Sequence, residues 1–567
     1  RSLRVIIPWH RVSREQIVEL NGLNPIPRLG SIQDVEQYAK SPWDQQNDPC
    51  VIIEGYESGG LCGRDSQYIL FQKALSCLND CRMIVAGPIG LLSFSALNSQ
   101  GIHSILLDEQ TLLLHDSYLP LRTKQLLNRV NGRQSIVLRS ALDNNEEVRC
   151  VSLPGKGAPG YLFGSSIDAS ELNEIARWNS EWIFPVGEGI DLAKEFCVKY
   201  RTLGRVISAY RSLRVSRGLA TRQPNTIADQ FGVKYPIIQG PMSRVSDNAE
   251  FAASVARGGA LPTIAAAMLS AEALEKVLVK TAELVPDLPW GVGLLGFIDS
   301  AHLQSQISVL KNSSASFCIL AGGTPAQAKE IASKNLRVFI HAPTPELLEL
   351  FIKEGWRDFI LEGRECGGHI GPLSSLNLWE RSIKVVLEQS PAVGREVCLV
   401  LAGGIHDQAS AAFAAYMVDD LAQVGATCGL LVGSAYLATR EIVQDKAITP
   451  TYQEVTIECT NTVFLETSPG HQSRCADTAF SREFNAKRDE LVRSQVPVRE
   501  ISNQLDRLIL GRLRLASKGL QRGESGLLQV TEEDQLELGM YMLGEAVCLI
   551  NNQTTIHQLH ESIKAGL

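Results

Sequence analysis

The sequence predicts an α/β protein whose main domain is a (β/α)8 TIM barrel. We expect a degenerate partial copy of that barrel before it and a helical C-terminal region after it. From about residue 225, eight short apolar runs alternate with longer amphipathic stretches, and several runs end in Gly or Pro. Strands and helices would also alternate along the chain of an open doubly wound sheet, but eight successive strand–helix units favour closure into a barrel.

The predicted strands are YPIIQG (235–240), ALPTIA (260–265), GVGLLGF (291–297), SFCILAG (316–322), RVFIHA (337–342), DFILEG (358–363), VCLVLAG (397–403) and CGLLVG (428–433). The stretches between them have the spacing of amphipathic helices. Examples are 248–258, 270–284, 324–335 and 344–355. We therefore expect the barrel domain over residues 225–445.

The bulk composition excludes several classes of protein. A chain of 567 residues exceeds one ordinary core, so two or more domains are expected. The net charge of -8 gives no general basic footprint for nucleic acid or an anionic membrane. No apolar run is long enough to span a membrane. The 13 cysteines form no CxxC pair, which favours reduced thiols in a cytoplasmic protein without a metal site. Because the first residue is Arg, we expect a piece of a longer chain.

Residues 1–160 repeat the second half of the barrel. EGYESGGLCG (54–63) matches EGRECGGHIG (362–371) at an offset of 308, and RMIVAGPIG (82–90) matches VCLVLAGGIH (397–406). Half a barrel leaves open sheet edges, so this copy must pack on another surface. We interpret it as a structural relic that scaffolds or dimerises.

Two further regions complete the predicted organisation. Residues 161–224 are expected to be a helical basic linker, and 199–223 contain seven Lys or Arg and no acid. That stretch is either a solvated connecting helix or a docking surface for an acidic partner such as a carrier protein. Residues 446–567 are expected to be a helical cap that returns to the barrel, with helical spacing in 484–523 and 533–565.

Two glycine motifs predict a phosphate site at the last two strands. Gly403 and Gly404 follow the seventh strand, and Gly433 and Ser434 follow the eighth. Barrels of this kind commonly hold a phosphate there, on backbone N–H groups that no side chain obstructs. Either motif alone is often only a turn.

His369 is the predicted catalytic residue. It follows Gly367 and Gly368 at the end of the sixth strand, and its pKa near neutrality suits proton transfer. His341, His406 and His471 compete with it, and His406 is expected to contact the anion. Cys366 is interpreted as a packing residue, because no histidine partner is fixed by spacing.

The motifs PIIQGPM, EGRECGGHIGPLSS, LAGGI and LVGSAYL resemble those of the nitropropane dioxygenase-like FMN barrels. That superfamily includes nitronate monooxygenases, enoyl-ACP reductases, and the enoyl reductase domains of polyunsaturated fatty acid and polyketide synthases. The resemblance covers about 225–445 and, more weakly, 539–547, a segment that in the family returns over the flavin. The phrase GRECGGHIGPLSS is most similar to the polyketide synthase versions.

The resemblance implies FMN at the barrel mouth, with its phosphate on the two glycine motifs and its ring near Gly240-Pro241-Met242. It also implies that His369 is the proton donor or base. Relatives carry Asn after the third strand, whereas this chain reads GVGLLGF there, so contact between Leu294 and the flavin would be through the backbone. This departure weighs against the nitronate reaction. The implied cofactor-binding residues are Gly240, Pro241, Met242, Leu294, Glu362, Gly367, Gly368, Gly403, Gly404, Gly433 and Ser434.

The front copy differs from the family pattern at each chemical position. Leu61 replaces the histidine, Pro88 replaces the second glycine, and Glu109-Gln110 falls opposite the Gly-Ser pair. A carboxylate repels a phosphate. We therefore expect no FMN in this copy.

These observations predict an FMN-dependent enoyl-ACP reductase that uses NAD(P)H as a transient reductant. The expected partners are an enoyl thioester on an acyl carrier protein, other modules of a polyketide or fatty acid synthase, and a second copy in a homodimer. No GxGxxG fingerprint is present, which fits a nicotinamide that visits and leaves. The alternatives are a nitronate monooxygenase, a non-catalytic scaffold of a megasynthase, and a phosphate-binding barrel of the inosinate dehydrogenase type.

Overall fold

The computed structural model describes residues 6–9, 25–41, 49–78, 80–102, 104–140, 147–153, 166–167, 183–213, 225–333, 335–524 and 526–567. Much of the predicted linker, including the basic residues of 214–223, lies outside these residues. The chain divides into two compact units. The first comprises Arg1–Leu219 with Pro372–Glu380, and the second comprises Ala220–Gly371 with Arg381–Leu567.

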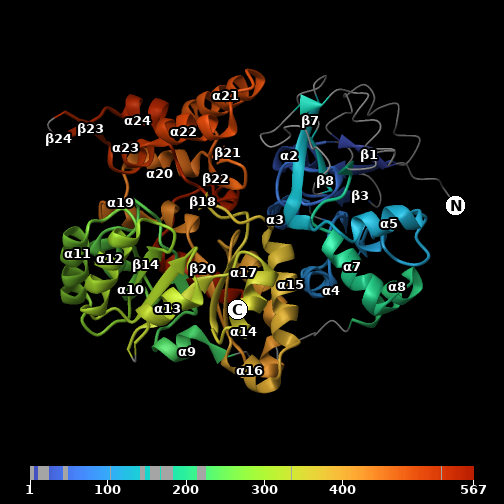
Figure 1. The fold of residues 1–567 in the computed structure, drawn as a ribbon, viewed down its shortest axis with the longest axis horizontal. Coiled ribbons are helices and arrows are strands. Elements are labelled where there is room, and N and C mark those ends of the chain that lie inside the picture. Colours follow the sequence, from blue (N-terminus) through green and yellow to red (C-terminus); the bar gives the residue numbers. More distant parts are fainter. Residues whose placement is uncertain are drawn as a thin grey trace. The chain divides into compact units, whose positions relative to one another are not determined.

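The second unit contains a closed barrel of eight parallel strands (Figure 1). They are β12 (Ile237–Gln239), β13 (Thr263–Ala265), β14 (Gly291–Leu295), β15 (Phe317–Ala321), β16 (Arg337–His341), β17 (Asp358–Glu362), β19 (Cys398–Ala402) and β20 (Thr427–Val432). Each lies where the sequence predicts a strand. β12 pairs with β20, and backbone hydrogen bonds from Gln239 to Leu261 and from Leu261 to Ile237 close the ring. The predicted (β/α)8 fold is confirmed.

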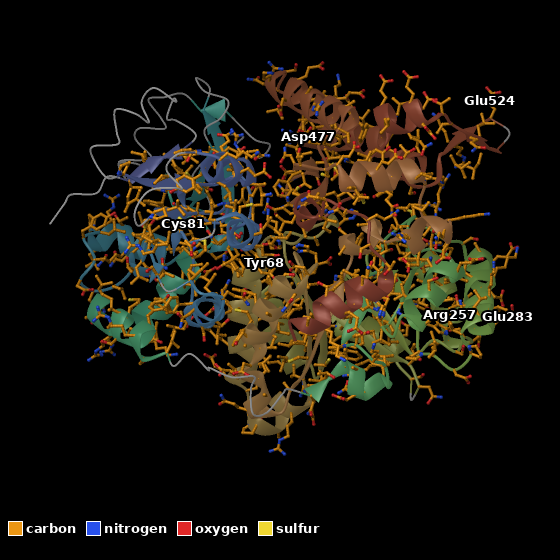
Figure 2. All side chains as sticks on the ribbon, turned by 180° about the vertical axis from the view of Figure 1, so that it is seen from behind. Tyr68, Cys81, Arg257, Glu283, Asp477 and Glu524 are labelled. Atoms are coloured by element: carbon orange, nitrogen blue, oxygen red, sulfur yellow. The ribbon has the colours of Figure 1, made fainter. Side chains whose placement is uncertain are left out.

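Helices surround this barrel at the predicted positions. They include α10 (Ala249–Arg257), α11 (Ala271–Leu284), α12 (Ser300–Lys311), α13 (Pro325–Ile331), α14 (Pro345–Lys353) and α17 (Gln408–Val418). Thr324 and Thr344 cap α13 and α14, and each is followed by Pro, which suits the first helical position. The outward faces are charged, as at Arg257 and Glu283 (Figure 2).

The amino-terminal end of the barrel is plugged by its own chain. α9 (Ile227–Phe231) packs there, and Ile227 lies so close to Gly429 that a Cβ on the glycine would be 2.4 Å from it. Phe231 and the strand residue Phe317 meet edge to face. The carboxyl ends of the strands are therefore the end at which a site can form.

The C-terminal region adds a β-hairpin that the sequence pattern does not predict. β21 (Thr462–Ser468) and β22 (His471–Ala476) pair with each other, and β22 also pairs with the two-residue strand β18 (Gly368–His369). The remaining elements are mainly helical: α20 (Pro450–Ile457), α21 (Ala479–Arg493), α22 (Val498–Ile509), α23 (Arg512–Lys518), α24 (Glu532–Leu538), η6 (Glu545–Leu549) and α25 (Ile556–Ala565). Among the described helices, none could cross a lipid bilayer.

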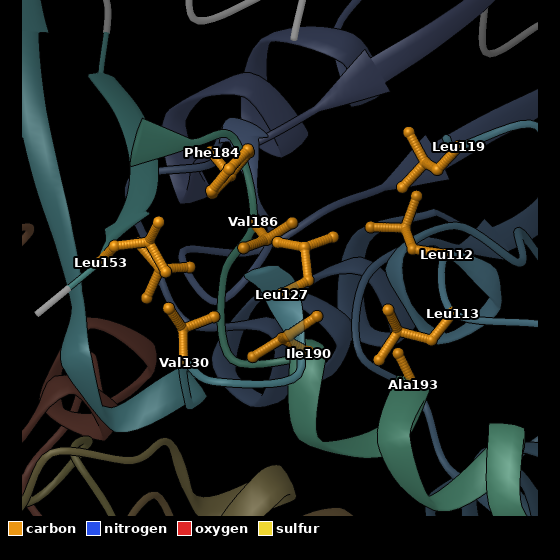
Figure 3. Packing of buried hydrophobic residues seen from close by; sticks show 11 residues of the cluster. Leu112, Leu113, Leu119, Leu127, Val130, Leu153, Phe184, Val186, Ile190 and Ala193 are labelled. Carbon is orange, nitrogen blue, oxygen red and sulfur yellow. The ribbon is translucent and has the colours of Figure 1, made fainter. Parts of the chain in front are cut away.

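The first unit contains a parallel half-barrel and a mainly antiparallel sheet. The half-barrel has the order β1 (Ile6–Pro8), β2 (Ile26–Leu29), β3 (Cys50–Ile53), β5 (Arg82–Val85), β6 (Ser104–Ile105). The second sheet has the order β10 (Ile183–Phe184), β8 (Glu147–Ser152), β7 (Ser135–Ser140), β9 (Ser166–Ile167), and β4 (Gly60–Leu61) also pairs with β8. A buried apolar cluster that includes Leu127, Phe184 and Ile190 packs beneath these elements (Figure 3).

Candidate functional site

The predicted site residues lie around one part of the barrel rim. Strands β17, β19, β20 and β12 are neighbours in that order, and apart from Leu294 in β14 the site residues lie at the ends of these strands or in the loops that follow them. Glu362 is the last residue of β17. The Gly240 N–H donates to Val432 O at 2.9 Å and joins the loop after β12 to the end of β20. Parallel packing thus gathers residues that are almost 200 positions apart in the chain.

The glycines after β19 and β20 shape the loops at the carboxyl ends of these two strands. Gly403 and Gly404 have φ of 106° and 80°, in the left-handed region that favours glycine. A Cβ on Gly433 would meet no atom within 4 Å. The short helix η5 (Ser434–Ala438) begins at the next residue. An open backbone at a helix start suits an anionic group such as a flavin phosphate.

His369 is held at the rim by a strand pairing. It lies in β18, opposite Ser473 of β22, and its imidazole is exposed. Surrounding protein lowers the pKa of His369, and the nearby His471 lowers it further, whereas Glu362 opposes the change. The ring is therefore mainly neutral at pH 7, and it can accept a proton or, once protonated, release it readily.

A second histidine faces the same carboxylate. His341 ends β16, and its Nδ1 lies 3.2 Å from Glu362 Oε2. Burial lowers the pKa of His341, and Glu362 opposes the change. Its Nε2 is buried and has no hydrogen-bond partner among the described residues. Buried polar atoms are normally paired, so this atom fits a bound group that supplies a partner at the rim.

Two arginines fasten the loop before β18 to the β21–β22 hairpin. Arg364 Nη2 donates to Gln472 Oε1 at 2.6 Å, and Arg474 Nε donates to Arg364 O at 3.1 Å. The two guanidinium groups lie 4.7 and 4.4 Å from the ring centre of Phe464. Arg474 Nη2 also lies 3.0 Å from Glu545 Oε2, and both side chains are buried. The sequence pattern alone predicts none of these contacts.

Residues 540–549 pass directly over the glycines of the rim. The Gly544 N–H donates to Ser434 Oγ at 2.7 Å. A Cβ on Gly367 would lie 2.6 Å from Gly544 N, so the two backbones are in contact and a side chain does not fit. This segment therefore connects the loop that carries His369 to the end of the eighth strand.

The other predicted residues occupy different surroundings. The Leu294 side chain is buried in β14, and its backbone pairs with β15. Pro241 packs against the backbone of β14, and Met242 beside it is half-buried. Burial raises the pKa of Cys366 well above its ordinary value, which fits the packing interpretation. Burial lowers the pKa of His406, and the neighbouring Asp407 opposes this change.

The first unit repeats the arginine contact without the histidine. Gly60 lies opposite Arg149 in the β4–β8 pairing, as Gly368 lies opposite Arg474. Arg149 Nε donates to Tyr56 O at 2.6 Å, and Tyr56 is the counterpart of Arg364 at the offset of 308. The arginine persists in a copy that has lost its histidine. Its conserved contact therefore has a structural purpose, which is to hold the glycine loop against the hairpin.

The segment that passes over the rim is repeated as well. VGEG (186–189) is the counterpart of LGEA (543–546). The Glu188 N–H donates to Glu57 O at 3.1 Å, as the Glu545 N–H donates to Glu365 O at 2.8 Å. The copy thus extends into residues that the sequence pattern assigns to a linker, because a four-residue repeat is too short to recognise without its contacts.

The carboxyl group of Glu109 fills the first unit's counterpart of the phosphate site. The Gly187 N–H donates to Glu109 Oε2 at 3.0 Å, where the second unit has a hydroxyl oxygen as acceptor. The Gly59 N–H donates to the other carboxylate oxygen. Burial raises the pKa of Glu109 to about 8, Asp108 adds to this, and the two backbone N–H groups oppose it. The backbone donors of this unit are already engaged by the protein's own side chain.

Comparison with known proteins gives a family match over the second unit. Residues 225–306 and 296–566, more than half of the chain, match the nitronate monooxygenase family model. No curated protein matches the chain.

Several solved structures are similar to part of the chain. FabK from Thermotoga maritima is 22% identical, with 60% of this chain and 94% of that one covered and a TM-score of 0.48. The enoyl reductase domain of MlnA from the macrolactin cluster of Bacillus amyloliquefaciens is 15% identical, with 62% and 97% covered and a TM-score of 0.47. Nitroalkane oxidase from Streptomyces ansochromogenes is 17% identical, with 60% and 97% covered and a TM-score of 0.46. On the family match over its barrel and C-terminal region, the chain belongs to the nitronate monooxygenase family of flavin-dependent oxidoreductases.

Proposed function

We propose that the protein is an FMN-dependent enoyl reductase. It reduces the 2,3 double bond of an enoyl thioester on an acyl carrier protein with NAD(P)H, in polyketide or polyunsaturated fatty acid biosynthesis. The observation that carries this proposal is the exposed His369, which β18–β22 pairing holds on the same rim as the open position at Gly433 after β20. The motif GRECGGHIGPLSS, which resembles those of synthase enoyl reductases, supports the same reaction.

The residues at the rim fit FMN. Gly403, Gly404, Gly433 and Ser434 would hold the phosphate, and Gly240–Met242 would lie along the ring. The unpaired His341 Nε2 would gain a partner. When bound, FMN supplies hydride transfer between nicotinamide and the β-carbon of the substrate.

His369 supplies the proton in this proposal. Reduction of an enoyl thioester at the β-carbon leaves negative charge on the α-carbon and carbonyl oxygen, and the reaction ends when a proton reaches the α-carbon. The lowered pKa of His369 makes its protonated form a stronger acid than an ordinary imidazolium, which favours the transfer. Arg474 and the hairpin hold the loop, so that the imidazole keeps its position.

A nitronate monooxygenase remains the second candidate. The family model that matches the chain carries this name. A mainly neutral His369 could also remove a proton from the carbon next to a nitro group. This candidate uses oxygen and needs no nicotinamide, so the two reactions can be separated by experiment.

The remaining parts of the proposal concern location and assembly. We place the reaction in the cytoplasm, where the 13 cysteines would stay reduced, as all are free in the structure. Other synthase modules and a second copy of the chain are the proposed partners.

The deciding experiment is the visible spectrum of the purified protein during anaerobic addition of NADPH and then of a crotonyl thioester. Flavin absorbance that bleaches with NADPH and returns with the thioester supports the enoyl reductase. Bound flavin that ignores the thioester but turns over with a nitronate and oxygen supports the monooxygenase. A colourless protein that cannot be loaded with FMN would contradict both and favour a scaffold.

A further inference from the structure

The first unit carries a group of strongly exposed apolar side chains. Tyr118, Leu121 and Val198 are 77%, 73% and 81% exposed, and they are three of the four most exposed large apolar residues in the described part of the chain. Single exposed apolar residues are common on soluble proteins, whereas contiguous groups mark interaction sites. The question is whether these three share one surface.

Their segments are built on one core. Leu119, Leu127 and Ala193 belong to the same buried cluster (Figure 3). Leu127 comes from α5 (Leu121–Leu127) and Ala193 from α7 (Ile190–Lys199). The three exposed residues therefore belong to segments that share one core.

Backbone hydrogen bonds join the same segments at their edge. The His115 N–H donates to Arg201 O at 2.9 Å. The Leu203 N–H donates to both carboxylate oxygens of Asp116 at 3.1 Å, so this acid caps α8 (Leu203–Ser212). Residues 115–121 and 198–205 therefore adjoin at this edge, and we call the exposed side chains of the two segments together the α5–α8 surface.

The charge around this patch is positive. Lys199, Arg201 and Arg205 are exposed on it. Residues 198–213 contain four basic side chains and no acid, although the whole chain has a net charge of -8. Two acids lie close to it: Asp116 accepts from the start of α8, and Glu195 lies one turn before Val198 and Lys199 on α7. An apolar group within a basic surround is complementary to an acidic helix that has an apolar face.

We infer that the α5–α8 surface docks an acidic amphipathic helix of the carrier protein that presents the acyl thioester. This inference rests on the proposed function for its choice of partner. The apolar side chains would supply the buried centre of the contact, and the lysine and arginines would steer the acidic helix. The docking surface lies on the unit that has lost its own histidine, which gives that unit a function in substrate delivery.

Two other occupants fit the patch less well. A second copy that placed this surface on itself would bring three basic side chains against the same three, and like charges repel. A flat anionic membrane would meet the acids Asp116 and Glu195 together with the basic side chains, whereas a narrow helix covers a smaller part of the surface. Both remain as outcomes of the test.

The test compares one acyl group on two carriers. Substrates are a crotonyl group on an acidic acyl carrier protein and the same group on free pantetheine. The variants are Val198→Asp, Leu121→Asp and Arg205→Glu in the full chain. We expect each to raise KM for the carrier-bound substrate about tenfold, within the range of interface hot spots, and to leave kcat and KM for crotonyl-pantetheine unchanged. Added salt should weaken only the carrier-bound reaction.

Matched controls come from the second unit. Leu510 is as exposed as Val198, so Leu510→Asp introduces the same chemistry at an equally exposed position. Arg499→Glu is the charge control. Both should leave the two KM values unchanged, and Arg205→Lys should retain carrier binding. Equal effects on the two substrates, or no effect of any α5–α8 variant, would overturn the inference.

A direct binding measurement separates this inference from the proposed reaction. If crotonyl-pantetheine is not reduced, the enoyl reductase proposal fails, and anisotropy of a fluorescent carrier protein then decides the docking. Binding that Val198→Asp weakens about tenfold supports the inference. Binding only to phosphatidylserine vesicles, or a dimer by light scattering that Val198→Asp dissociates, would overturn it.

Discussion

Arg474 Nη2 lies 3.0 Å from Glu545 Oε2, and this buried ion pair connects the β21–β22 hairpin to the segment that passes over the glycine rim. The same arginine donates to the backbone of the loop that carries His369. Three segments that are far apart in the chain therefore depend on one guanidinium group. Its counterpart Arg149 makes the equivalent backbone contact in the first unit.

Arg474→Ala should lower the free energy of unfolding by about 3 kcal/mol, because it leaves Glu545 buried without its ion-pair partner. Urea unfolding followed by circular dichroism measures this. The control is Arg482→Ala, which removes an exposed ion pair with Asp477 and should cost less than about 1 kcal/mol. Equal losses for the two variants would show that burial of the Arg474 pair is unimportant.

His369→Gln should lower kcat by about a hundredfold or more, the range for removal of a general acid or base, without loss of bound flavin. The flavin spectrum and the steady-state rate with crotonyl-pantetheine provide the two readouts. His341→Gln is the comparison, since it changes a rim histidine that the proposal does not use for proton transfer. A variant at position 369 with the wild-type rate would exclude His369 as the proton donor.

His471→Ala should shift the pH dependence of kcat to higher pH. A reductase that needs protonated His369 loses activity as pH rises through the pKa of that residue. His471 lowers this pKa, so its removal raises the pKa and preserves activity at higher pH. The pH profile with crotonyl-pantetheine measures the change, and a shift to lower pH would contradict the assignment.

Gly433→Ala should weaken FMN binding about tenfold or more while the protein stays folded. The added Cβ meets no protein atom within 4 Å, so any cost must come from the space that we assign to the phosphate. Flavin fluorescence titration gives the affinity, and thermal unfolding of the flavin-free protein gives the stability. Gly204→Ala, which also meets no atom within 4 Å, is the control and should not alter FMN affinity.

The chain should bind one FMN, not two. The Glu109 side chain fills the first unit's counterpart of the phosphate site, and two backbone N–H groups already donate to its carboxyl oxygens. The ratio of flavin absorbance to protein concentration, after removal of free FMN, measures the stoichiometry. Glu109→Gln keeps a side chain of the same size there and should leave the ratio at one. A ratio of two would mean that the carboxylate does not exclude the cofactor.

Stability should fall as pH decreases from about 6.5 to about 4 because of His560. Burial lowers the pKa of His560 from 6.5 to about 4, so the unfolded chain takes up a proton that the folded chain does not. At about 1.4 kcal/mol per pH unit, this costs roughly 3 kcal/mol in total. Urea unfolding at several pH values gives the slope, and His560→Gln should remove most of it.

The barrel could be predicted from the sequence because each strand is a local signal. Runs such as DFILEG and CGLLVG are apolar, short and bounded by glycine, and all eight predicted runs became strands. The glycine motifs were also predictable, since a position after a given strand fixes a position on the rim. The hairpin was not, because neither strand has the alternation of a half-buried strand: β21 (TVFLETS) has its apolar residues side by side, and β22 (HQSRCA) begins with four polar residues.

The contacts around His369 required the tertiary structure. Arg364 and Gln472 are 108 residues apart, and nothing local in either segment indicates the other. The His341–Glu362 contact likewise follows from the adjacency of β16 and β17, although both residues were visible as polar ends of apolar runs. The repeat of Gly-Glu at 187–188 and 544–545 was a usable signal, but it gains meaning only from the matching backbone hydrogen bonds.

The sequence by itself determined the eightfold alternation, the position of the glycines on the rim and the loss of the histidine in the front copy. These are properties of single residues and of local periodicity. Only the tertiary structure decided how the GGH loop is held, that the Gly59 and Gly187 N–H groups donate to Glu109, and that the segments of three exposed apolar residues adjoin in a basic region. Each of these depends on the distance between segments that are remote in the chain, which is set by packing and not by local pattern.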